Sequence, residues 1–157
     1  MTGRLFPFNV RVYGIFTREG KVLVSDELVF GQRITKFPGG GLHFGEGTAD
    51  CILREMKEET GEDFNVLAHF YTTDYFQVSA FNPAHQVISI YYLLDAKPSV
   101  SLRTSEKPFD FALAAEGAQS LRWIPENKIN ENDFTLPIDR KVGHLLKIFF
   151  QNKTLKT

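Results

Sequence analysis

The run Pro38-Gly39-Gly40-Gly41, followed by a segment of helical periodicity, constrains this chain more than any other feature. Consecutive glycines give the backbone conformations that other residues avoid, so the run is expected to form a tight, open loop. The helix is expected to begin near Thr48, whose hydroxyl suits a helix N-terminus, and to end at Gly61, where a left-handed cap is least costly. The fold therefore has to accommodate a glycine loop that leads directly into a helix.

The expected helix has two faces of opposite character. At a turn of about 100° per residue, its apolar and small side chains fall in one stripe, which predicts packing on a sheet. That stripe consists of Ala49, Ile52, Leu53, Met56 and Thr60. A second arc, roughly opposite, holds Glu55, Glu58 and Glu59. Arg54 stands four residues before Glu58, a spacing that favours an ion pair.

An acidic helix face has an ordinary explanation as well as a functional one. On a solvated face, Glu, Lys and Arg side chains form exposed pairs that contribute about 0.2 to 0.5 kcal/mol each. Here, however, Lys57 projects away from the acids, and Glu46 lies beside the glycine loop that leads into the helix. Hard oxygen ligands grouped on a rigid element are what Mg²⁺ prefers. The sequence therefore favours a metal site over a solvated face.

The rest of the chain predicts strands and one further helix. Runs of β-branched and aromatic residues between turn residues predict strands, and apolar residues at helical spacing predict an amphipathic helix near the C-terminus. The expected strands are Asn9 to Thr17 and Lys21 to Ser25, joined as a hairpin, then Asn65 to Val78, Gln86 to Ala96 and Leu121 to Ile124; the helix is Asp139 to Gln151. Residues 97 to 119 lack periodicity and are expected to form a long surface excursion.

Composition limits the class of protein. A length of 157 residues fits one domain, residues 1 to 157, and a net charge of −1 gives no field that would recruit a polynucleotide. Apolar runs shorter than the roughly 18 residues that span a bilayer, an N-terminus without a secretory signal and a single cysteine predict a cytoplasmic protein that does not enter a membrane. The 13% share of aromatic residues favours a ring-rich core and leaves a homodimer open.

The residues from Gly40 to Glu62 read Gly-x5-Glu-x7-Arg-Glu-Met-x-Glu-Glu-x-Gly-Glu. This pattern resembles the Nudix box, Gly-x5-Glu-x7-Arg-Glu-U-x-Glu-Glu-x-Gly-U, in which U is aliphatic, and it departs from the box at Glu62 alone. The order of strands and helices around it is also similar to that of MutT-like members. The resemblance implies an α/β fold, a single-domain Nudix α/β/α sandwich with a mixed central sheet.

The resemblance also implies roles for individual residues. Glu55, Glu58 and Glu59 would bind the catalytic metals, with the backbone carbonyl of Gly40 as a further ligand, and Arg54 would orient Glu58. Glu46 would support the loop. The implied cofactor is Mg²⁺, with Mn²⁺ as an alternative, and its chemistry would be activation of a water for attack on phosphorus.

The general base is left open between a glutamate of the box and one from a downstream loop. Glu116 is the downstream candidate, because it lies seven residues before Trp123, in a placement similar to the loop glutamate of mutator-type members. An ordinary exposed loop acid is the competing interpretation. Asp95, Asp110 and Glu126 are weaker alternatives.

Further residues near the box are candidates for substrate contact. The predicted substrate-binding set is Arg33, Lys36, Phe37, Gly39, Gly40 and Gly41, with Arg33 and Lys36 as phosphate partners and Phe37, Tyr75 or Phe76 as rings beside a base. Arg11 and His43 are weaker contacts. The nearby Cys51 has no local base to activate it and is expected to pack, and the four histidines lack the spacing of a zinc site.

Two classes of function fit these features. The first is a Mg-dependent hydrolase that cleaves the diphosphate bond of a nucleoside diphosphate linked to a group X: a nucleotide sugar, an ADP-ribose-like compound or a nucleoside triphosphate. The alternative is a non-catalytic nucleotide- or sugar-binding sensor domain of the same fold. The complete acidic set favours catalysis. Isoprenoid diphosphate isomerisation would need further acid-base groups that the sequence does not place. The signatures of ADP-ribose-cleaving and NADH-cleaving members are absent, so the substrate stays unassigned.

Overall fold

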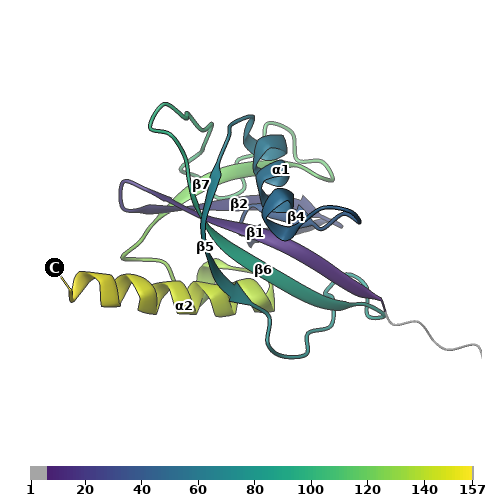
Figure 1. Cartoon of the computed structure of the whole chain (residues 1–157). Coiled ribbons are helices and arrows are strands. Elements are labelled where there is room, and N and C mark those ends of the chain that lie inside the picture. The colour runs from purple at the N-terminus through teal and green to yellow at the C-terminus, as the bar shows by residue number, and fades with distance from the viewer. Residues whose placement is uncertain (1–6, 157) are drawn as a thin grey trace, which may run out of the picture.

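The computed structural model describes residues 7 to 156, which form one mixed sheet between two helices (Figure 1). The strands are β1 (Phe8–Arg18), β2 (Lys21–Val29), β3 (Gln32–Lys36), β4 (Gly39–Gly41), β5 (Asn65–Thr72), β6 (Gln86–Asp95) and β7 (Gln119–Pro125). The helices are α1 (Thr48–Thr60) and α2 (Pro137–Thr154), with a short 3-10 turn, η1 (Glu131–Asp133), before α2.

The sheet has β1 at its centre. Its order is β3-β2-β1-β6-β5, with β4 also paired to β1 and β7 to β2. The β1–β6 pair is parallel and the other pairs are antiparallel, so the sheet is mixed. Helix α1 covers one face and α2 the other. The predicted α/β/α sandwich is confirmed.

Alternating side chains on the central strands build two cores. On β1, Val12 and Phe16 pack with the buried face of α1, whereas Tyr13 and Ile15 pack with the buried face of α2. Leu23 of β2 joins the α1 core, and its neighbours on either side join the α2 core. Because successive side chains of a strand point to opposite faces, two apolar layers need strands that are apolar on both sides.

The glycine run forms a strand rather than the expected open loop. Gly39, Gly40 and Gly41 pair with Tyr13, Val12 and Arg11 of β1. A Cβ atom at Gly39 would lie 2.1 Å from the carbonyl oxygen of Val12, so a larger residue would collide with the partner strand. The glycines therefore allow two backbones to approach each other, and the expectation of a loop is corrected.

Other boundaries differ from the expected ones for physical reasons. Helix α1 ends as predicted at Gly61, whose φ is +76°. The predicted hairpin is present, but β1 and β2 share only two residue pairs, because the edge of β1 that faces β2 pairs with β4 at Arg11 to Tyr13. Strand β3, which the sequence pattern did not predict, pairs along β2. β5 stops at Thr72, and residues 73 to 85 form a loop instead of continuing to Val78.

The C-terminal part of the chain follows the sequence pattern closely. Residues 97 to 118 contain no helix or strand in the structure, as expected of a surface excursion, apart from an isolated bridge at Ser105. Helix α2 begins two residues before the expected Asp139, because Pro137 suits the first turn of a helix. Within residues 7 to 156, no helix has both the length and the apolar character needed to cross a membrane.

Candidate active site

The acidic side chains of helix α1 lie beside β4. Cys51, Ile52 and Met56 are fully buried, which fixes the rotation of the helix on the sheet. The Glu55 and Glu59 side chains then lie against the glycine strand, whereas Glu58 points outward with 58% of its side chain exposed. Two of the three predicted ligands therefore meet β4, and the third faces solvent beside them.

Gly40 and Glu55 are in close contact. A Cβ atom at Gly40 would lie 2.5 Å from the carboxyl carbon of Glu55, so the residue type at position 40 decides whether that carboxylate can reach the strand. Next to it, the Gly39 amide donates to Glu59 Oε1 at 3.4 Å. The strand therefore brings its backbone to the carboxylates, which is the arrangement that a carbonyl ligand from Gly40 requires.

Arg54 joins the acids of the helix to the loop before it. Its guanidinium binds Glu46 through two hydrogen bonds, of 2.9 and 2.7 Å, and contacts Glu55 Oε1 at 2.8 Å and Glu58 Oε1 at 3.3 Å. The predicted pair with Glu58 is present, but Glu46 is the partner with the better geometry. These hydrogen bonds from Arg54 lower the pKa of Glu46 to about 2.

The carboxylates have the character of a cation site. Glu59 Oε2 is buried and has no hydrogen-bond partner, and burial raises the pKa of Glu59 to about 7 despite the nearby Lys36 ammonium. Across residues 7 to 156, however, no three His, Cys, Asp or Glu side chains already form a metal-binding cluster. An orphaned carboxylate oxygen next to Glu55 and a glycine backbone fits a hard cation, which takes oxygen ligands.

Cys51 behaves as a packing residue. Its side chain is fully buried, and burial raises the pKa of the thiol to about 12. The thiol donates weakly to the Gly41 carbonyl at 3.5 Å. A protonated, inaccessible thiol is a poor nucleophile, which agrees with the packing role expected from the sequence. His43, the histidine of the adjoining loop, is exposed.

The predicted substrate-binding residues have different locations. Lys36 is buried, pairs with Glu27 at 2.9 Å and donates to the Gly39 carbonyl at 3.1 Å. Burial is the largest single influence on the pKa of Lys36 and lowers it, but Glu27, Tyr13 and Glu59 together outweigh burial, so the pKa is raised. Arg33 points to the other side of β3, with its guanidinium 5.6 Å from the centre of the Phe109 ring.

Phe37 lies in the core. Its ring is fully buried and stacks on Phe134, with 4.4 Å between the ring centres. A ring without exposed surface has no face to offer a substrate, so the prediction that Phe37 binds substrate is corrected. Tyr75 and Phe76 do not line the pocket on the α2 side of the sheet.

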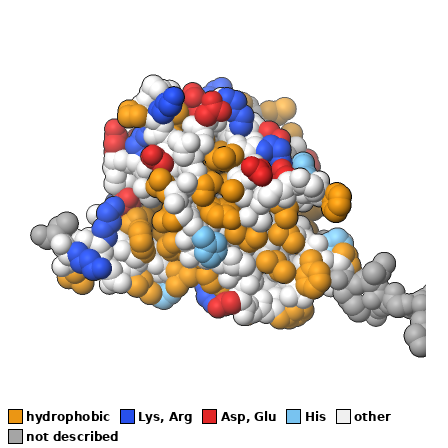
Figure 2. Space-filling view, in the orientation of Figure 1, with side chains coloured by type: hydrophobic (Ala, Val, Ile, Leu, Met, Phe, Trp, Pro, Cys, Tyr) orange, Lys and Arg blue, Asp and Glu red, His pale blue; other side chains and the backbone are white. Residues whose placement is uncertain are grey.

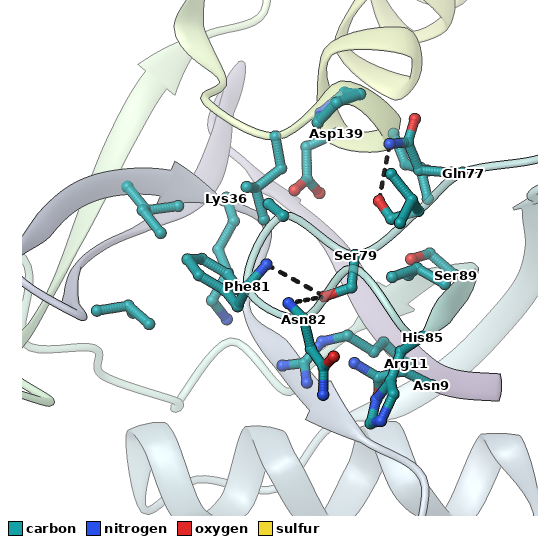
Figure 3. Close-up of a pocket in the computed structure, with 18 of the residues that line it drawn as sticks. Asn9, Arg11, Lys36, Gln77, Ser79, Phe81, Asn82, His85, Ser89 and Asp139 are labelled. Carbon is teal, nitrogen blue, oxygen red and sulfur yellow. Dashed lines mark hydrogen bonds between the residues drawn. The ribbon is translucent and has the colours of Figure 1, made fainter. Parts of the chain in front are cut away.

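A pocket of about 440 Å³ opens on the α2 side of the sheet (Figure 3). Its walls come from β1, β2, β3 and β6, from the loop 73–85 and from the first turn of α2. Arg11, which the sequence placed among the weaker contacts, lines it, as does Lys36. The pocket lies next to the acids, because Gly39 contacts both: its amide donates to Glu59, and its carbonyl accepts from Lys36, which lines the pocket.

Sequence reasoning missed several residues of this pocket, including Glu27 and Asp139. Asp139 is buried, accepts a hydrogen bond of 2.9 Å from the Tyr91 hydroxyl, and has a pKa that burial raises to about 6. A signal for it exists, since Asp139 stands three and seven residues before Val142 and Leu146 and so shares their buried stripe. An acid on an apolar stripe needs a partner or a role.

Glu116 belongs to the loop before β7, and its side chain contacts the turn between β2 and β3. Its Oε1 accepts from the Phe30 amide at 2.6 Å and its Oε2 from the Gly31 amide at 3.2 Å. Among the weaker candidates for the base, Asp110 accepts from the Ser105 hydroxyl at 2.6 Å, Asp95 is the exposed end of β6, and Glu126 lines a separate cavity beside α2. The base role of Glu116 stays a prediction.

Known proteins provide an independent comparison. The NUDIX domain model matches residues 5 to 146. Nudix hydrolase 2 of Arabidopsis thaliana is 32% identical over 107 residues, which cover 64% of this chain and 32% of that protein, so the chain spans about a third of the relative's length.

Solved structures share the fold. A MutT protein from Methanosarcina mazei Go1 has a TM-score of 0.65 and 18% identity, covering 94% of this chain and 96% of that one. A NUDIX hydrolase from Nitrosomonas europaea has a TM-score of 0.58 and 20% identity, covering 85% and 84%. With a family match over most of its length, on a fold that carries the acidic helix beside a glycine strand, the chain belongs to the Nudix family.

Proposed function

We propose that this protein is a metal-dependent hydrolase of a diphosphate bond in a nucleoside diphosphate linked to another group. The observation that carries the proposal is the buried, partnerless Oε2 of Glu59, held beside Glu55 and the glycine strand. A buried anionic oxygen without a donor is costly, and a cation removes that cost. Membership of the Nudix family supports the same activity.

Glu55, Glu58, Glu59 and the Gly40 carbonyl would hold Mg²⁺ or Mn²⁺. When bound, the metal would neutralise the diphosphate and lower the pKa of a bound water. The chain itself contributes position. Arg54 would orient Glu55 and Glu58 through its contacts of 2.8 and 3.3 Å. Its own position is fixed by Glu46. Glu46 would therefore support the site indirectly, through Arg54.

The pocket would hold the nucleoside part of the substrate. Its volume of about 440 Å³ lies within the range of roughly 300 to 1,000 Å³ that small-molecule sites occupy. Lys36 connects it with the acids, since its ammonium contacts both Glu27 of the pocket and the Gly39 carbonyl. A diphosphate that crossed this connection would meet Lys36 and Arg11 before the carboxylates. Arg33 faces Phe109 and would act from outside the pocket.

The substrate is proposed as a class: nucleotide sugars, ADP-ribose-like compounds or nucleoside triphosphates. The general base is proposed to be a glutamate of the box, because both oxygens of Glu116, the downstream candidate, already accept hydrogen bonds from the β2–β3 turn. The cytoplasmic location and the homodimer stay predictions.

A substrate panel tests the proposal. Nucleotide sugars, ADP-ribose, dinucleoside polyphosphates, coenzyme A and nucleoside triphosphates would be incubated with Mg²⁺, and released phosphate compounds measured. We expect turnover of at least one compound, its loss on chelation of the metal, and its loss in Glu58→Gln, whose exposed side chain is not needed for folding. Unchanged turnover in a folded Glu58→Gln protein would remove Glu58 from the site. Tight binding without any turnover would indicate a sensor domain instead.

A further inference from the structure

Two aromatic rings meet at the mouth of the pocket. Phe30 lies on the β2–β3 turn and Phe81 on the loop 73–85, and their ring centres are 5.4 Å apart with an angle of 46° between the planes. Both line the pocket, yet Phe30 is 71% exposed and Phe81 is 39% exposed. Rings at a pocket entrance that leave this much surface in water have apolar area available for a ligand.

The turn that carries Phe30 is strained. Phe30 has a φ of +49° and Gly31 a φ of +72°, the combination of a type I′ turn, in which Asn-Gly is the usual pair. A phenylalanine in the left-handed region costs about 1 to 2 kcal/mol. Strain of this kind persists when surrounding contacts enforce it and when the side chain at that position has a use. The turn therefore places a ring where glycine or asparagine would be less costly.

Glu116 supplies the contacts that hold this turn. Its two oxygens accept from the amides of Phe30 and Gly31, the two residues with positive φ. The next residue, Gly117, donates to the Leu28 carbonyl at 2.9 Å and so ties Glu116 to the end of β2. An acceptor pair with a full negative charge on two adjacent amides is stronger than neutral hydrogen bonds would be.

The second ring is also held before any ligand arrives. The Ser79 hydroxyl accepts from the amides of Phe81, at 3.2 Å, and Asn82, at 3.3 Å, as Figure 3 shows. The Ser79 amide donates to the His85 carbonyl, and the His85 amide donates to the Asn82 carbonyl, which closes the loop on itself. Two independently fixed segments therefore present the rings, so little conformational entropy would be lost on binding.

We infer that Phe30 and Phe81, whose rings contact each other, form an aromatic platform on which a nucleobase stacks, and that Glu116 is the positioning residue of this platform. The inference rests on the proposed function and adds that the pocket recognises the nucleobase of the substrate. Apolar side chains next to the rings, Val29, Ile34 and Val87, suit a planar base rather than a charged diphosphate. Any base can stack on an aromatic ring, so the platform favours nucleotides over sugar phosphates but does not discriminate among the bases.

Binding titrations test the aromatic platform without relying on catalysis. Isothermal titration calorimetry with AMP, GMP, CMP, UMP and ribose 5-phosphate, with no metal added, would be run on the wild type, Phe30→Leu and Phe81→Leu. We expect at least one nucleotide to bind more tightly than ribose 5-phosphate, and each substitution to weaken that nucleotide about 5- to 100-fold. Affinity for ribose 5-phosphate should stay the same. Phe76→Leu is the matched control, since Phe76 lies on the same loop, is 73% exposed and does not line the pocket.

Two results would overturn the aromatic platform. The first is that no nucleotide binds more tightly than ribose 5-phosphate. The second is that Phe30→Leu and Phe81→Leu bind nucleotides as the wild type and Phe76→Leu do. Either result leaves hydrolysis in the substrate panel unaffected, so failure of the aromatic platform is distinct from failure of the proposed function.

Glu116→Gln separates positioning from catalysis. Glutamine keeps one acceptor oxygen for the turn, so we expect nucleotide binding to weaken about 3- to 10-fold, less than in Glu116→Ala, with KM raised and kcat within about threefold of the wild type. A general base would instead give a kcat lower by about 10²- to 10⁴-fold and a lost limb in the pH profile, and that result would overturn the positioning role. If no compound of the panel is turned over, the nucleotide titrations of these two variants still decide it.

Discussion

The acidic site and the pocket are adjacent, but they are built in different ways. The acidic site takes its contacts from a continuous stretch, from Gly39 to Glu59, in which Arg54 reaches Glu46, Glu55 and Glu58. The pocket takes its walls from segments that extend from Asn9 to Asp139. One residue, Gly39, connects the two through its amide and its carbonyl.

Under the proposed function, this difference separates the residues that would carry out the reaction from those that would select the substrate. Helical spacing alone brings Arg54 to Glu58 and sets Glu55 and Glu59 on one side of α1, so the acidic site varies little once its sequence is given. The pocket depends on where loops end and how strands pair, and its residues are free to differ while the acids stay the same. Under the proposed function, different parts of the chain would therefore determine the bond that is cut and the group that is recognised.

The largest expected effect comes from the acidic site alone. Glu59→Gln should lower turnover by roughly 10²- to 10³-fold, because it removes a charge that is fixed before the reaction begins. The same change should leave stability unchanged or raise it at neutral pH, since a buried carboxylate oxygen without a partner is replaced by a neutral amide. Steady-state kinetics and chemical unfolding would measure the two effects.

Glu62→Gln provides the matched control for that change, because Glu62 follows the helix and is not among the proposed ligands. It should retain both turnover and stability. A Glu59→Gln protein that turned over substrate normally would show that the acidic site is not the reacting site.

The contact between the helix and β4 is the next test. Gly40→Ala places a Cβ atom 2.5 Å from the Glu55 carboxyl carbon, so that carboxylate has to move. We expect turnover to fall about 10- to 100-fold, the usual effect of disturbing the orientation of a metal ligand, with nucleotide binding in the pocket retained. Kinetics and the metal-free titrations would show whether the two regions separate.

Gly20→Ala is the control for a glycine substitution as such. Gly20 has a φ of +71° and nothing within 4 Å of an added Cβ atom, so alanine there should reduce stability by about 1 kcal/mol and leave turnover alone. Equal turnover in Gly40→Ala and the wild type would argue against a ligand role for this part of β4.

The smallest expected effect concerns the pocket and appears as a dependence of stability on pH. The pKa of Asp139 is about 6 in the folded protein, above its ordinary 3.8, because of burial, while the Tyr91 hydroxyl and the charges of Lys36 and Arg11 oppose the rise. The folded state therefore binds more protons than the unfolded state between these values, and stability falls as pH rises through about 6. From roughly pH 5 to pH 7 the wild type should lose about 1 kcal/mol relative to Asp139→Asn.

Urea unfolding of both proteins at several pH values would measure this difference. Asparagine keeps an acceptor oxygen for the Tyr91 hydroxyl, so the hydrogen bond of 2.9 Å has a replacement. Parallel stability curves for the two proteins would mean that Asp139 titrates normally and that burial does not decide its charge.

The elements that sequence predicted well are those whose pattern depends on near neighbours. Helix α1 and its Gly61 cap follow from periodicity and from one permissive residue, and both are observed. The β3 and β4 strands were missed because their residues carry weak local signals. Three glycines have low strand propensity, and they form β4 because β1 offers a partner backbone that tolerates no side chain at Gly39.

Residues of the site divide in the same manner. The placement of Glu55, Glu58, Glu59 and Arg54 on one helix could be predicted, since a helix fixes neighbours three and four positions apart. The burial of Phe37 and the engagement of Glu116 with the β2–β3 turn could not, because the partners of these residues, such as Phe134 and Phe30, are distant in the sequence.

The sequence by itself was enough to predict the family and the acidic helix and to propose the residues that would hold a metal, because these depend on neighbours along α1 and on its preceding loop. The tertiary structure decided that the glycines form a strand, that Glu59 has a buried oxygen without a partner, and that two rings from separate loops meet over a pocket. These features require strand pairing and packing between segments far apart in the chain, and the physical information for them lies in the whole sheet rather than in any single stretch.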